Sequence, residues 1–151
     1  MNTHKFTFSV ALGAVYWLLA ALFVRAFGAF FFTGNTPALL GLYAASVPGT
    51  WLLIQNARWL GRLAPAEVLD SVVVMTWTAA VLDGVALTFF GSLYGTSAPV
   101  VMLGAAWILW GAGWGLGVAY LMKHNVGKRK GNVPAATARE GVKVKLQGTR
   151  A

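Results

Sequence analysis

The stretch of sequence that decides the fold is VLDSVVVMTWTAAVLDGVALTFF, residues 68–90, which is strongly apolar yet carries Asp83 well inside it. A helix rises about 1.5 Å per residue, so this stretch is long enough to cross the roughly 30 Å hydrocarbon core of a bilayer. A second apolar stretch, residues 6–32, carries Arg25. Ionisable side chains at membrane depth are costly and often functional, so Arg25 and Asp83 are the first candidate site residues.

The composition indicates an integral membrane protein. The chain of 151 residues is 58% hydrophobic and only 11% charged, whereas soluble domains are about 25% charged. It contains no Cys, which excludes disulfides and thiolate metal sites, and its two His residues lie near opposite ends of the apolar region. We find no nucleophile, metal-ligand or phosphate-loop pattern, so the sequence predicts neither an enzyme nor a cofactor.

The apolar segments predict an all-α, polytopic membrane protein with a four-helix transmembrane bundle. The expected helices are residues 6–32, 38–55, 66–90 and 100–122, followed by a basic, mobile tail over residues 123–151. The first segment exceeds the ~7–15-residue core of a signal peptide, so we interpret it as an uncleaved helix. Pro48 predicts a kink in the second helix, which serves either as a hinge or cavity wall or as a simple packing bend.

The positions of Lys and Arg predict the orientation. One precedes the first helix, two lie between the second and third, eight follow the fourth, and the other two connections have none. Positive charge favours the cytoplasmic side, so both termini are expected in the cytoplasm.

Arg25 and Asp83 are predicted to lie at equal depth. Arg25 is seven residues before Phe32, and Asp83 is seven residues before Phe90, at the outward ends of two helices that run in the same direction. Each charge then lies about 10 Å below its helix end. We therefore expect an Arg25–Asp83 ion pair, either as a structural clamp or as a functional site. The alternative is an Arg25 side chain that reaches outward to the headgroups.

The fourth segment presents Gly104, Gly111 and Gly115 almost in line on a helical wheel. Small residues at this spacing permit close approach of helices, so the three glycines are candidate helix-packing residues. The partner is either another helix of the bundle or a second copy of the chain, or a different membrane protein. Neighbouring Trp residues are compatible with an aromatic cage for a cation, although membrane helices carry such residues without one.

The basic tail predicts contact with anionic lipid at the cytoplasmic face. The positive charge is concentrated beside the last apolar segment, which favours a membrane surface over nucleic acid as the partner. The candidate lipid-binding residues are Lys123, Lys128, Arg129 and Lys130.

Three runs resemble a family of small four-helix bacterial membrane proteins known as a domain of unknown function. These are VPGTWLLIQNARWLGRLAPAE, VLDGVALTFFGSLYG and GAAWILWGAGWGLGVAYLM, and the likeness spans most of residues 6–122. It rests on the helix pattern, an Arg late in the first helix and the Leu82-Asp83-Gly84 step in the third. The resemblance implies a bacterial inner-membrane protein and carries over no catalytic residue.

Two functions therefore stay open. The first is a non-enzymatic membrane protein with an accessory or interaction role, and the second is a small transporter or channel that uses Arg25 and Asp83. Small multidrug transporters depend on an acidic residue in the first helix, where this chain has Arg25, and this difference disfavours the second function. A cavity at the charged residues would favour transport, and a dry bundle would favour the accessory role.

Overall fold

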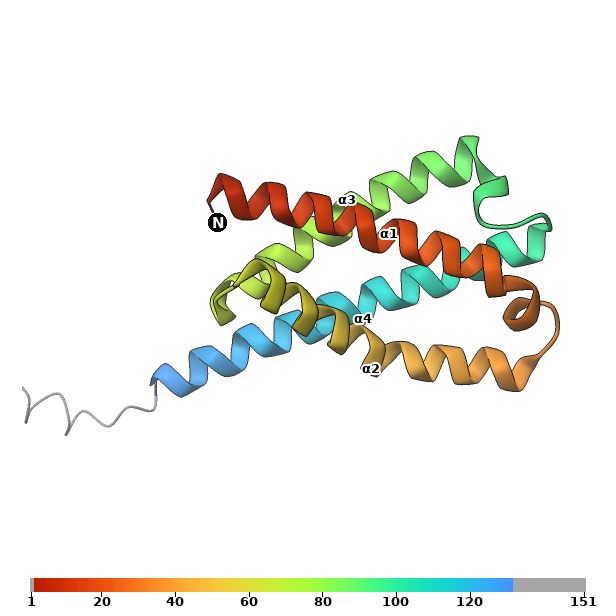
Figure 1. Cartoon of the computed structure of the whole chain (residues 1–151). Helices are drawn as coiled ribbons and strands as arrows, with labels where there is room; N and C mark the ends of the chain where they lie inside the picture. Colours follow the sequence, from red (N-terminus) through yellow and green to blue (C-terminus); the bar gives the residue numbers. More distant parts are fainter. Residues whose placement is uncertain (1, 132–151) are drawn as a thin grey trace, which may run out of the picture.

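A computed structural model describes the backbone of residues 2–131 and the side chains of residues 2–124. In this part of the chain the protein is helical and has no strand, which confirms the predicted fold class. Figure 1 shows the helices side by side in one bundle. The α1–α2 connection and the α3–α4 connection lie at the same end of it. The elements are α1 (Thr3–Phe32), α2 (Thr36–Gly61), η1 (Pro65–Glu67), α3 (Val68–Phe89), η2 (Gly91–Leu93) and α4 (Ala98–Gly131).

The polar residues at the helix starts explain where α1 and α2 begin. The side chain of Asn2 accepts a hydrogen bond from the backbone N–H of Lys5, and the side chain of Asn35 accepts one from Ala38. Each satisfies a backbone donor that has no partner inside its helix. Pro37 lies in the first turn of α2, where its missing N–H costs nothing.

Two helices extend well beyond their predicted C-terminal ends. α2 runs to Gly61 instead of Gln55, because Ala57 is buried in the bundle and keeps the helix packed past the polar residues. α2 also passes through Pro48 without a break. α4 continues to Gly131 instead of ending at Met122, so the start of the predicted basic tail is helical. Lys and Arg are good helix formers, and their polarity marks the membrane boundary without ending a helix. Residues 132–151 of the predicted tail lie outside the described residues.

The tightest contact in the bundle is between α1 and α3. Ser9 and Ser71 are fully buried, and their hydroxyl oxygens are 2.7 Å apart in a hydrogen bond across the two helices. One turn further along α1, a Cβ atom on Gly13 would lie only 2.7 Å from the backbone oxygen of Met75. Small residues at these positions let the two backbones approach closely, as is common between membrane helices.

The buried apolar residues form two clusters. One includes Val24, Phe32 and Tyr94 near the connecting loops. The other includes Val68 and Ala119 near the chain termini. A cavity between the helices is lined by residues that belong to, or pack against, both clusters.

The outer surface of the bundle suits a bilayer. Large apolar side chains such as Leu40, Phe89 and Met102 are mostly exposed, with exposed fractions of 65%, 74% and 67%. All four α-helices of the described chain contain a segment long and apolar enough to span a membrane. The molecule is therefore a multi-pass membrane protein.

Candidate functional site

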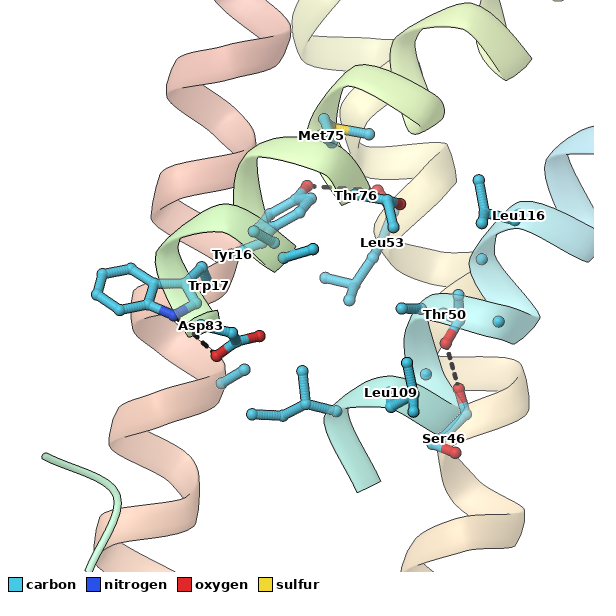
Figure 2. Close-up of a pocket in the computed structure, with 18 of the residues that line it drawn as sticks. Tyr16, Trp17, Ser46, Thr50, Leu53, Met75, Thr76, Asp83, Leu109 and Leu116 are labelled. Carbon is cyan, nitrogen blue, oxygen red and sulfur yellow. Dashed lines mark hydrogen bonds between the residues drawn. The ribbon is translucent and has the colours of Figure 1, made fainter. Parts of the chain in front are cut away.

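A half-enclosed cavity of about 900 Å³ lies among the four helices. α2 and α3 make few direct contacts with each other, which leaves space between them. Small residues add to this space, and they include Gly49, Ala79, Ala80 and Gly111. Figure 2 shows Trp17 and Asp83 on one side of the cavity, with Ser46 and Thr50 across from them. The wall is mainly apolar, and Asp83 is the one carboxylate among the lining residues.

Asp83 is held by two aromatic donors. The indole nitrogen of Trp17 donates a hydrogen bond to Oδ1 of Asp83 at 2.9 Å, and the hydroxyl of Tyr94 donates to the same oxygen. The Trp17 nitrogen is also 3.0 Å from the Tyr94 hydroxyl oxygen, which closes a three-residue cluster. Burial raises the pKa of the Tyr94 hydroxyl above its usual range, and the hydrogen bond to Asp83 raises it further. Tyr94 therefore keeps its proton and acts as a donor.

The second carboxylate oxygen of Asp83 faces the cavity. Oδ2 has no hydrogen-bond partner among the described residues, and these residues do not bury it completely. Figure 2 shows the Asp83 carboxylate at the cavity wall, with Trp17 bonded to one oxygen and the other directed at the open centre. The arrangement fixes the orientation of the carboxylate and leaves one acceptor oxygen open to a ligand.

Arg25 does not form the predicted ion pair with Asp83. Its Nη1 atom instead donates to the backbone oxygen of Ser92 at 2.6 Å, and its side chain lies on the exposed side of α1. Counting depth along the helices left out the α3–α4 connection, which contacts both residues. Arg25 binds this connection through Ser92, and Asp83 binds it through Tyr94. The two charges thus hold the same loop without meeting.

Asp83 and Arg25 lie on different kinds of helix face. Thr76, Ala79 and Ala80 line the cavity together with Asp83 on α3. On α1, Ala21 and Gly28 are buried, whereas Arg25 is exposed. Asp83 therefore belongs to the cavity face of α3, and Arg25 lies off the buried face of α1.

The three candidate packing glycines of α4 have different surroundings. A Cβ on Gly104 would collide with Val24 of α1, and a Cβ on Gly115 would lie 3.3 Å from the Thr50 side chain of α2. Gly111 has nothing within 4 Å and lines the cavity. Gly104 and Gly115 thus serve packing within one bundle, whereas Gly111 provides open space.

The carboxylates at the charged end of the bundle have Lys partners. Glu67 pairs with Lys5 at 2.5 Å, and Asp70 pairs with Lys123 at 3.3 Å. Of the candidate lipid-binding residues, Lys123 is thus engaged in an ion pair. The side chains of Lys128, Arg129 and Lys130 lie outside the described residues.

Sequence reasoning missed Trp17 and Tyr94 as site residues. Trp and Tyr in membrane proteins are usually assigned to the interfaces, and Tyr94 belongs to a segment that reads as an outer loop. A useful signal was available, because a buried carboxylate requires hydrogen-bond donors and Tyr94 lies only eleven residues after Asp83.

The fold and the site together define a small helical membrane protein with an acidic cavity. The chain belongs to a family of unknown function, DUF5367, whose model matches residues 30–126. This confirms the resemblance to a four-helix family of unknown function, although the matched region begins after Arg25. Asp83 and Tyr94 lie inside the matched region, and Trp17 lies outside it. Comparisons with curated proteins and with solved structures gave no match.

Proposed function

We propose that the protein is a non-enzymatic membrane protein that binds an amphiphilic cation in the cavity and acts as a small carrier for it. The observation that carries this proposal is the Asp83 carboxylate, with one oxygen held by Trp17 and Tyr94 and the other open to an apolar cavity. A charged carboxylate at membrane depth costs about 2.5–3.5 kcal/mol on insertion scales. A cationic ligand offsets that cost, and an apolar ligand body suits the rest of the wall.

The size and aromatic content of the cavity support the same ligand class. Its volume of about 900 Å³ falls within the range of small-molecule sites, which is roughly 300–1,000 Å³. Tyr16, Trp17 and Trp107 contribute aromatic rings to the wall, and such rings attract cations. The transporter hypothesis thus rests on Asp83 and its aromatic neighbours, without Arg25.

The membrane and the orientation are part of the proposal. We propose a bacterial inner-membrane location with both termini in the cytoplasm. The support is the placement of charge, since Lys5, Arg58, Arg62 and Lys123 all belong to the end of the bundle where the chain starts and α4 exits. The two connections at the opposite end contain no charged residue. This asymmetry matches the preference of Lys and Arg for cytoplasmic segments.

The test is equilibrium binding of a hydrophobic cation, tetraphenylphosphonium, to the purified full-length protein in neutral detergent. Asp83→Asn should weaken binding about ten-fold or more, because the Coulomb attraction between the carboxylate and the phosphonium charge is lost in a mainly apolar, weakly screened site. Asp70→Asn is the matched control, since it makes the same chemical change at the exposed Lys123 ion pair. It should leave binding nearly unchanged.

A second variant separates ligand binding from stability. Gly111→Leu places a side chain in the cavity where nothing lies within 4 Å of the added Cβ, and it leaves the Asp83 cluster intact. It should block tetraphenylphosphonium while the thermal midpoint is preserved. Equal binding by the wild type, Asp83→Asn and Gly111→Leu would contradict the carrier proposal.

The accessory role is the second candidate. Gly113 and Gly117 of α4 have nothing within 4 Å of an added Cβ and are exposed, so they offer a small-residue face to another helix. This face suits a second copy of the chain or a partner membrane protein. Loss of self-association in Gly113→Leu, measured by crosslinking in membranes, together with unchanged cation binding by Asp83→Asn, would favour this role.

A further inference from the structure

A second, smaller pocket of about 410 Å³ lies at the charged end of the bundle, where α2 ends. We call it the Arg58–Arg62 pocket, and its lining residues are Gln55, Arg58, Trp59, Arg62 and Leu63. None of these residues lines the Asp83 cavity. The pocket is therefore a separate feature that the proposed carrier function does not use.

The turn after α2 brings the two arginines together. Arg62 adopts a left-handed backbone conformation with φ 46° and ψ 43°, and in the described chain it is the only non-glycine residue with positive φ. The backbone N–H of Leu63 then donates to the Arg58 oxygen at 3.1 Å, and the Leu63 side chain is buried. A bulky residue rarely adopts this conformation, so the packing of the turn must hold Arg62 in place.

The two arginines lack a counter-charge among the described residues. Glu67 is paired with Lys5, and Asp70 is paired with Lys123. Arg58 donates Nη1 to the neutral Gln55 side chain at 2.8 Å, while its Nε is buried without a partner. The C-terminal end of α2 carries only a partial negative charge, which favours nearby cations but supplies no anion. The pocket thus presents two guanidinium groups with unused donors.

We propose that the Arg58–Arg62 pocket binds a phosphate group, carried by an anionic lipid headgroup or free in solution. Guanidinium groups bind phosphate oxygens with paired, charge-assisted hydrogen bonds. Trp59 beside the pocket is 80% exposed, as expected for a Trp at the membrane–water interface. This position lies at the depth of lipid phosphates, so an anionic phospholipid is the source that the position favours.

The test measures phosphatidylglycerol bound to the full-length protein in neutral detergent by native mass spectrometry. Arg58→Gln and Arg62→Gln should each weaken binding about five-fold, the effect expected for one charge near an anionic headgroup. Lys123→Gln removes one positive charge from the same end of the bundle, and it should have little effect because Lys123 already pairs with Asp70. Asp83→Asn should also leave lipid binding unchanged, which keeps this proposal distinct from the carrier function.

One further variant and one competition measurement complete the test. Arg62→Gly removes the same charge at a position where glycine is favoured, so folding is preserved if Arg58→Gln proves unstable. Inorganic phosphate that displaces the lipid from the wild type would identify free phosphate as a ligand, and failure to displace it would identify the lipid. Equal lipid binding by the wild type and both arginine variants, or an equal loss in Lys123→Gln, would overturn the proposal.

Discussion

At the scale of single residues, the two charges at membrane depth are stabilised by different neutral partners. Asp83 accepts hydrogen bonds from Trp17 and Tyr94, while Arg25 donates to the Ser92 backbone. Neutral donors satisfy a carboxylate without cancelling its charge. A direct Arg25–Asp83 ion pair would have cancelled that charge. The absence of this pair leaves the Asp83 carboxylate available for the cation that we propose.

This difference predicts how two substitutions combine. Arg25→Gln and Asp83→Asn should each lower the free energy of unfolding, because the first removes the guanidinium donor to the Ser92 oxygen and the second replaces the charged acceptor of the Tyr94 hydroxyl with a weaker, neutral one. The double variant should show no recovery relative to the sum of the single effects, since neither residue leaves the other as an unpaired partner. Thermal or denaturant unfolding in detergent measures this. A double variant clearly more stable than Asp83→Asn alone would indicate a direct ion pair instead.

At the scale of elements, the contact between α1 and α3 depends on small residues. Gly13 lies against the backbone of Met75, so an added methyl group meets atoms that cannot rotate away. Gly13→Ala should destabilise the bundle by about 1–3 kcal/mol, because the helices must separate to accommodate it. The thermal midpoint of the purified protein provides the measurement.

Gly41 of α2 offers a matched control for Gly13. It is also helical, but nothing lies within 4 Å of an added Cβ. Gly41→Ala should be neutral or stabilising by up to about 1 kcal/mol, because Ala favours helix more than Gly does. Similar losses in both variants would mean that the close approach of α1 and α3 is not what Gly13 provides.

The sequence predicted most of the fold because apolar length and charged ends are properties of local segments. The spans carrying Arg25 and Asp83 were found for this reason. The ends of α2 and α4 were predicted too early, since polarity was taken as a sign of helix termination. Trp17 and Tyr94, the partners of Asp83, were missed because they come from α1 and from the α3–α4 connection. Their contact with Asp83 depends on tertiary packing, which has no periodic signature in the sequence.

At the scale of the whole molecule, charge is distributed unevenly along the bundle axis. The described ion pairs, Lys5–Glu67 and Lys123–Asp70, and the Arg58–Arg62 pocket all lie at one end. The connections at the other end are neutral and short. Between these ends lies the cavity, with Asp83 in its wall. In the described part of the chain, charged residues thus mark one end of the bundle, and an acidic cavity lies between the two ends.

The orientation is testable because the chain contains no Cys. A Cys introduced at Asn35 or Ser97, in the neutral connections, should react with an impermeant thiol reagent added outside intact cells. A Cys at Ala66, exposed at the charged end of the bundle, should be protected until the cells are opened. Labelling of Ala66→Cys from outside would reverse the proposed orientation.

The central claim is that Asp83 holds a cation inside the cavity. The most direct measurement is an experimental structure of the full-length protein with tetraphenylarsonium, whose arsenic is located by anomalous scattering. We predict one arsenic position within the cavity, beside Oδ2 of Asp83 and the rings of Tyr16 and Trp17, and no such position in Asp83→Asn. Arsenic found only on the lipid-facing surface, or in the cavity equally with and without the Asp83 carboxylate, would contradict the claim.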